Sequence, residues 1–150
     1  MLLLGAFSTP SAAGPTLVDI RPYVQWAVNV TGYPEPAILP VVRFVTEAQM
    51  QAWYCPGENC NIAGGYRGGL YLYVDETLPE EKRDEVLIHE ITHFLHAPLN
   101  MSRCAQEYEA TKVEWMYRVL EHGSEDDFAF NWEFYKCKPS DLQSSPSSSP

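Results

Sequence analysis

The sequence has few basic residues and no long apolar stretch. It holds 10 Lys and Arg residues against 20 Asp and Glu residues, and its formal net charge is -10 over 150 residues. A chain this acidic repels a phosphate backbone at long range, so we exclude nucleic acid as a partner. No stretch reaches the roughly 20 apolar residues that a membrane-spanning helix needs, and we therefore expect no membrane partner.

The sequence also lacks the Cys-x-x-Cys pairs that are typical of a four-cysteine zinc site. Its four cysteines are Cys55, Cys60, Cys104 and Cys137. An even number in a small chain favours two disulfides, although three connectivities are open. Closeness in the sequence favours Cys55–Cys60, which would close the loop CPGENC, and Cys104–Cys137, which would tie two late helices together.

The N-terminus has no Lys or Arg ahead of its short apolar run, which extends from Leu2 to Phe7. The small residues Ser11-Ala12-Ala13 follow and fit a signal-peptidase site. We interpret residues 1–13 as a shortened signal peptide and expect a secreted or periplasmic protein. The Ser/Pro-rich residues 139–150 predict a disordered tail, which leaves residues 14–138 as one folded domain.

Hydrophobic periodicity predicts an α+β domain. Residues 16–32 carry apolar side chains at helical spacing and end in a glycine. Two strands are predicted by alternating or β-branched residues, and between them we expect one or two helical turns and a glycine-rich loop. The strands are expected at 41–46 and 70–76, the helical turns at 47–55 and the loop at 56–69.

Three further helices are predicted in the second half of the chain, at about 77–97, 103–122 and 125–137. Thr77 and Glu80 have the spacing of a capping box, and Pro79 falls near the start of the first of these helices. The second of these helices ends at Gly123.

The helix predicted for 77–97 contains the sequence His89-Glu90-Ile91-Thr92-His93. Residues four apart lie on one face of a helix, so His89 and His93 can bind one Zn²⁺ through imidazole nitrogens. Glu90 reaches the open side of the metal, where its carboxylate can take a proton from an activated water molecule. The pattern predicts a zinc site with His89 and His93 as ligands and Glu90 as general base.

The competing interpretation is a set of partly buried histidines that form hydrogen bonds within a core. A random match to His-Glu-x-x-His in this chain has a chance of about one in a hundred, so we favour the metal site. A metzincin would place a third His at position 99, which is Leu99. His96 comes too early for that pattern, and we expect it to have a structural role.

The chain resembles the gluzincins, zinc metallopeptidases whose third ligand is a Glu on a later helix. The resemblance rests on His-Glu-x-x-His and on Glu107-Tyr108-Glu109-Ala110-Thr111, and it covers residues 69–122. It implies Glu107 as the third zinc ligand, while Thr111 stands where the family often has a supporting acid. The short interval between His93 and Glu107 is similar to that of small exported bacterial zincins. The implied fold is a compact zincin-like domain, with a small mixed sheet packed on an active-site helix and a second, ligand-bearing helix.

Glu109 is an alternative third ligand, because on a helical wheel it lies on the apolar side of the helix while Glu107 lies on the polar side. The two side chains point about 200° apart, so only one of them can face the metal. Tyr117 and His122 are candidate donors to a transition-state oxyanion. The strand GLYLYV before the zinc helix is expected to lie along the cleft and to pair with an extended peptide.

These features predict a zinc-dependent hydrolase, a peptidase that acts on peptide or protein substrates. The alternative is an exported zincin-fold binding or structural protein without catalytic turnover. Glu90 argues against that alternative, because a site that only binds metal needs no base beside it.

Overall fold

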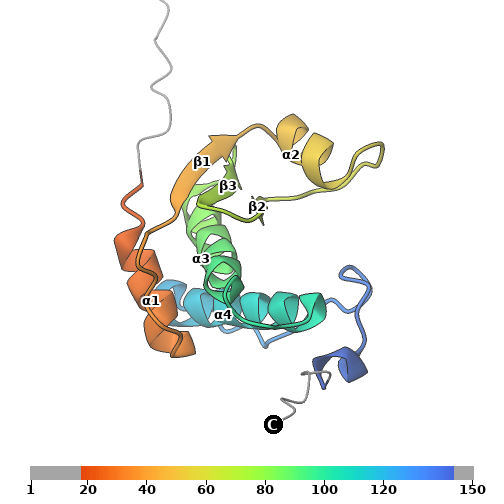
Figure 1. Ribbon diagram of the computed structural model, residues 1–150. Helices are drawn as coiled ribbons and strands as arrows, with labels where there is room; N and C mark the ends of the chain where they lie inside the picture. Colours follow the sequence, from red (N-terminus) through yellow and green to blue (C-terminus); the bar gives the residue numbers. More distant parts are fainter. Residues whose placement is uncertain (1–17, 144–150) are drawn as a thin grey trace, which may run out of the picture.

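Four α-helices and a three-stranded sheet are built by residues 18–143, the part of the chain that the computed structural model describes (Figure 1). The α+β class and the small mixed sheet that were predicted from the sequence are confirmed. The elements in chain order are α1 Arg21–Thr31, β1 Val41–Val45, α2 Glu47–Tyr54, β2 Gly64–Tyr66, β3 Tyr71–Asp75, α3 Glu80–His96, α4 Arg103–His122 and the short 3-10 helix η1 Pro139–Leu142.

Some of the predicted segments fall outside this part of the chain. The signal peptide predicted for residues 1–13 is one of them. Of the tail predicted for 139–150, the first residues form η1 and residues 144–150 also lie outside. Within the described residues, no helix combines the length and the apolar character that are needed to cross a membrane.

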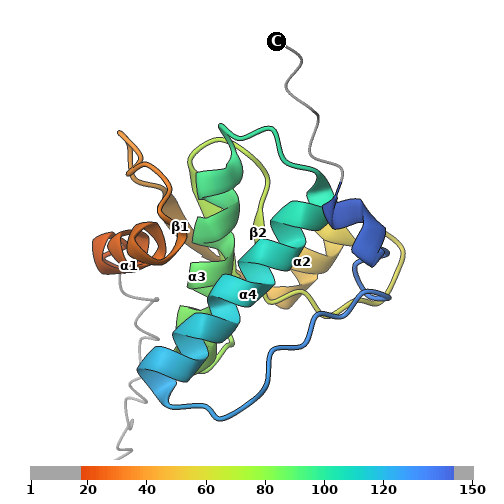
Figure 2. The ribbon, with the colours of Figure 1, turned by 90° about the horizontal axis from the view of Figure 1, so that it is seen from below.

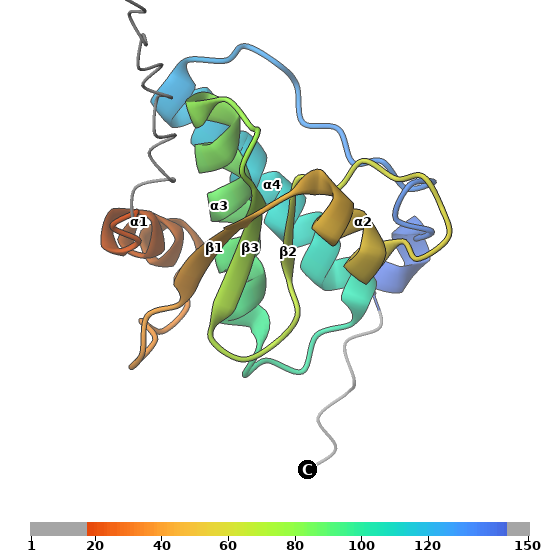
Figure 3. The ribbon, with the colours of Figure 1, turned by 90° about the horizontal axis from the view of Figure 1, so that it is seen from above.

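The sheet covers one side of α3, and α4 crosses the other side (Figures 1 and 3). Its strand order is β1-β3-β2, with β1 parallel and β2 antiparallel to the central strand β3. The core lies where β3, α3 and α1 meet. It contains Ile20, Val24, Ala27, Leu72, Val74, Leu87, Ile91 and Leu95.

The start of α3 differs from the prediction. Asp75, at the end of β3, accepts hydrogen bonds at 2.8 Å from both the backbone N–H and the hydroxyl of Thr77. Thr77 is therefore held in a turn after the strand, and the predicted capping box with Glu80 does not form. The helix begins at Glu80 with Pro79 as its N-cap. Its first turn carries Glu80 and Glu81, whose negative charges interact favourably with the positive end of the helix dipole.

The helix predicted for 125–137 is wrong, because residues 123–138 form an extended segment with a few turns. Phe128, Phe130 and Trp132 occur at every second position, and all three contact Tyr108 on α4. Only an extended chain places alternate residues on one face. Figure 2 shows this segment running back beside α4 towards its first turn.

Both disulfides pair as predicted. Cys55–Cys60 closes the loop between α2 and β2, and Cys104–Cys137 joins the first turn of α4 to the end of the extended segment. The second disulfide therefore links a helix to an extended segment, where the sequence had suggested two helices.

The two disulfides should contribute unequally to stability, because a cross-link restricts the unfolded chain more when it closes a longer loop. The sequence separations are 33 residues for Cys104–Cys137 and 5 for Cys55–Cys60. Replacing Cys104 and Cys137 by serine should lower the free energy of unfolding by about 3–4 kcal/mol. Replacing Cys55 and Cys60 by serine should lower it by about 2 kcal/mol. Chemical denaturation of the two variants measures the difference, and equal losses would contradict it.

Candidate metal centre

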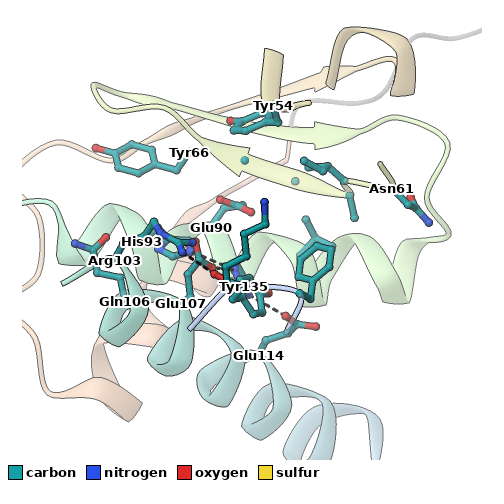
Figure 4. Close-up of a pocket in the computed structure, with 18 residues that line it drawn as sticks. Tyr54, Asn61, Tyr66, Glu90, His93, Arg103, Gln106, Glu107, Glu114 and Tyr135 are labelled. Carbon is teal, nitrogen blue, oxygen red and sulfur yellow. Dashed lines mark hydrogen bonds and ion pairs between the residues drawn. The ribbon is translucent and has the colours of Figure 1, made fainter. Parts of the chain in front are cut away.

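The His-Glu-x-x-His segment lies in the C-terminal half of α3, where it faces α4 (Figure 4). His89 and His93 lie one turn apart, and their Nε2 atoms are 3.1 Å from each other. Glu107 on α4 places its Oε2 atom 3.6 Å from Nε2 of His89 and 3.3 Å from Nε2 of His93. Two imidazoles and one carboxylate therefore converge on one point.

These distances fit a divalent cation. Zinc ligands at about 2.0–2.1 Å in a tetrahedron are separated from each other by about 3.3 Å. The three separations in this cluster are 3.1, 3.3 and 3.6 Å. Two nitrogens and a carboxylate oxygen also match the donor set that zinc takes in catalytic sites, where a fourth position stays open. Among the described residues, His89, His93 and Glu107 thus form a group that could hold a metal ion.

Glu114 fixes the orientation of the first histidine. Its Oε2 atom lies 3.0 Å from Nδ1 of His89. A carboxylate there favours the tautomer with the proton on Nδ1, which leaves the lone pair of Nε2 pointing at the cluster. Sequence analysis missed this role, although Glu114 lies seven residues after Glu107 and hence on the same face of α4.

Thr111 stands where the gluzincin pattern often has a supporting acid, but it does not support the ligands in this way. Its hydroxyl oxygen is buried and has no hydrogen-bond partner within the described chain. The carboxylate that supports His89 comes from Glu114, about one turn further along α4.

The carboxylates of the cluster strongly influence its protonation. Burial alone would lower the pKa of His89, but Glu107 and Glu114 outweigh burial and raise that pKa well above its ordinary value. Burial would raise the pKa of Glu107, but the hydrogen bonds from His89 and His93 lower it far below the usual range. The carboxylate of Glu107 is therefore ionised at neutral pH, and its negative charge favours a cation beside it.

Glu90 is a buried carboxylate beside this cluster, with only 6% of its surface exposed. Among the hydrogen bonds of the described residues, none involves its carboxylate. Burial raises the pKa of Glu90 to about 7, with Glu107 and Glu114 adding to the rise and His89 opposing it. An ionisable group of this kind is costly to bury and is typical of functional sites.

Gly64 of β2 leaves space for the side chain of Glu90 on α3. A Cβ atom at position 64 would overlap Val86 and lie 3.0 Å from Oε1 of Glu90. On the opposite face of the strand, a Cβ atom at Gly65 would overlap the ring of Tyr54. The two glycines let the strand fit closely between a tyrosine and the carboxylate.

Glu109, the alternative ligand, points away from the cluster. Its Oε2 atom accepts a hydrogen bond of 2.6 Å from the hydroxyl of Tyr33 and lies 3.1 Å from Nε2 of His96. His96 is fully buried in this network, as its expected structural role requires. The structure thus brings Glu107 to the two histidines and pairs Glu109 with Tyr33 and His96.

The cluster opens into a cavity of about 760 Å³. Residues 61–66, which include β2, form one wall, and Glu90, His93 and Glu107 lie on its floor. The expectation that strand GLYLYV lies along the cleft is wrong, because that strand is β3 and is paired on both sides. The strand with an unpaired edge on the cavity is β2, which sequence analysis took for part of a loop.

The two candidate oxyanion donors lie elsewhere. Tyr117 contacts Trp26 at a ring-centroid distance of 5.0 Å, and His122 contacts Tyr117 and Glu85. Neither belongs to the described residues that line the cavity. Their assignment as oxyanion donors is therefore wrong.

A second group of potential ligands contains Cys104, Cys137 and Asp141. Both sulfur atoms are joined in a disulfide and offer no thiolate, so the group is not a metal site. Comparisons with models of protein families, with characterised proteins and with solved structures find no match to this chain.

The two candidate third ligands can be separated by matched substitutions. We expect Glu107→Gln to abolish tight zinc binding, because a neutral amide is a poor zinc ligand. Glu109→Gln should retain one zinc ion, since its side chain contacts only Tyr33 and His96. Metal analysis after dialysis against a weak chelator measures both variants. Zinc lost from Glu109→Gln and kept by Glu107→Gln would reverse the assignment.

Glu114 should affect metal affinity without binding the metal. We expect Glu114→Ala to weaken zinc binding about 10- to 100-fold, the usual effect of removing the partner of a ligating histidine. Glu125→Ala, which removes an exposed carboxylate beyond the end of α4, serves as the control. Competition with a zinc chelator gives the dissociation constants, and an unchanged constant in Glu114→Ala would show that His89 needs no support.

Proposed function

We propose that the protein is a zinc-dependent hydrolase of the gluzincin type, and that it cleaves peptide bonds. One observation carries this proposal. Three ligand atoms with the separations of a zinc tetrahedron lie in the same cavity as Glu90, a buried carboxylate that forms no hydrogen bond within the described residues. A purely structural cluster has no need of such a carboxylate.

His89, His93 and Glu107 would hold the metal ion. When bound, zinc polarises the scissile carbonyl and lowers the pKa of water. Glu90 takes the proton from the attacking water and returns it to the leaving amine. A pKa of about 7 suits both transfers, because the group accepts and releases a proton close to neutral pH.

The edge of β2 suits an extended peptide as substrate. Its inner edge pairs with β3, and residues 61–66 line the cavity beside Glu90. An extended chain can form backbone hydrogen bonds with such an edge, which recognises the peptide backbone independently of its side chains. The scissile bond of a peptide on this edge would lie between β2 and the two histidines.

The protein is proposed to act outside the cytoplasm. Both disulfides require an oxidising environment, which favours secretion or the periplasm. The signal peptide expected from the sequence agrees with that location.

Glu90→Gln tests the catalytic role directly. Glutamine has the shape of glutamate and fits the same space beside Gly64, but it cannot accept the proton. We expect hydrolysis of a generic peptide substrate to fall about 100- to 10,000-fold while zinc binding is retained. Activity and metal content are measured on the same preparation.

The matched control is Glu85→Gln, which changes another buried glutamate of α3. Glu85 contacts Lys82 and His122, and it does not line the cavity. Its variant should hydrolyse the peptide at the wild-type rate. A wild-type protein that binds zinc but hydrolyses no peptide, with no change in Glu90→Gln, would favour a binding protein over an enzyme.

A further inference from the structure

Two basic residues stand out among the described residues that line the cavity. They are Arg103, at the start of α4, and Lys136, near the end of the extended segment. The carboxylates of the same cavity are Glu90, Glu107 and Glu114. In a chain with a net charge of -10, a pair of cations in the candidate active-site cavity needs an explanation.

The Cys104–Cys137 disulfide holds the two cations near each other. Arg103 directly precedes Cys104, Lys136 directly precedes Cys137, and the Cα atoms of the two cysteines are 5.8 Å apart. Nη2 of Arg103 also donates a hydrogen bond of 2.6 Å to the carbonyl oxygen of Tyr135. Two residues that are far apart in the sequence are thus linked through the disulfide, and both line the cavity.

Arg103 and Lys136 form no ion pair within 4.0 Å with a carboxylate of the described residues. Asp141 has a carboxylate oxygen within 4.8 Å of the two sulfur atoms, and it accepts a hydrogen bond from the backbone N–H of Lys138. The contacts of Arg103 use Nη2 alone, so its other N–H groups are available for a ligand.

The backbone at Lys136 is also unusual. Its φ angle is 53°, and every other positive φ in the described chain belongs to a glycine. Lysine adopts this left-handed conformation less readily than glycine does. Lys136 ends a turn in which the backbone N–H of Cys137 donates a hydrogen bond of 2.9 Å to the carbonyl oxygen of Trp132, so backbone geometry as well as the disulfide sets its position.

We propose that Arg103 and Lys136 form an anion subsite that binds a carboxylate of the substrate. This inference rests on the proposed function, because the subsite belongs to the same cavity. The carboxylate has two sources in a peptide, the free C-terminus and the side chain of Asp or Glu. An Arg held by Tyr135 and an exposed Lys can share one such group through charge-assisted hydrogen bonds.

Three N-acetylated peptides of one neutral sequence test the subsite. The first has a free C-terminal carboxylate, the second a C-terminal amide, and the third an amide with one Asp in place of Asn. Binding is measured on the zinc-loaded Glu90→Gln protein, so the readout needs no turnover. We expect one acidic peptide to bind about three- to tenfold more tightly than the neutral one, and the advantage should shrink at high salt.

Lys136→Gln and Lys138→Gln, each made in the Glu90→Gln protein, form a matched pair. Both remove one exposed lysine charge from the same segment, but only Lys136 lines the cavity. The affinity ratio of acidic to neutral peptide should fall to about one in Lys136→Gln and stay unchanged in Lys138→Gln. The acidic peptide that shows the advantage identifies the source of the carboxylate.

Two results would overturn the subsite. One is equal binding of acidic and neutral peptides, and the other is an equal change of the affinity ratio in the two lysine variants. Cleavage of the neutral peptide by the wild-type protein, measured in parallel, tests the proposed function separately. Cleavage without an acidic preference rejects the subsite alone, and an acidic preference without cleavage of any peptide rejects only the enzyme.

Discussion

The candidate site depends on how α3 and α4 pack against each other. Ala110 and Val113 of α4 are buried, and Ala110 is fully so, which lets the two helices approach closely. Glu107 and Glu114 lie one turn before Ala110 and one turn after it, on the same side of the helix. The apolar contact therefore sets the position of two carboxylates at once. One faces both Nε2 atoms, and the other contacts Nδ1 of His89.

Most buried polar groups of α3 form contacts that stabilise the fold. Glu85 contacts Lys82 and His122, Thr92 donates a hydrogen bond to the carbonyl oxygen of Ile88, and His96 contacts Glu109. Each of these groups has at least one partner among the described residues, although Nδ1 of His96 has none. Glu90 differs from them, because its side chain is buried beside Gly64 and its carboxylate, which lines the cavity, forms no hydrogen bond with the described residues. A group that destabilises the fold at neutral pH and faces a cavity is better explained by chemistry than by packing.

The sequence predicted those features that follow from local rules. The spacing of His89 and His93 needs only a helix, and α4 has the predicted bounds because Ser102 caps its start and Gly123 adopts φ of 67° at its end. The choice between Glu107 and Glu109 needed the packing of α3 on α4, which no local pattern contains. The strand β2 was missed because its three residues include two glycines, and its conformation depends on pairing with β3. The extended segment was mistaken for a helix. Its alternating aromatic residues share a contact with Tyr108, and that contact cannot be known from the sequence.

The cavity has a metal end, at His89, His93 and Glu107, and a cationic end, at Arg103 and Lys136. Different forces stabilise the two ends, although α4 contributes residues to both. Noncovalent packing of α3 on α4 sets the metal end, and the Cys104–Cys137 disulfide sets the cationic end. Cys104 and Glu107 lie three residues apart, so the disulfide also fixes the first turn of the helix that carries the proposed third ligand. The aromatic contacts of the extended segment reach Tyr135, which stacks on Phe130, and the hydrogen bond from Arg103 to the carbonyl oxygen of Tyr135 adds to them. The covalent link and these noncovalent contacts together hold an exposed segment at a defined place beside the candidate metal centre.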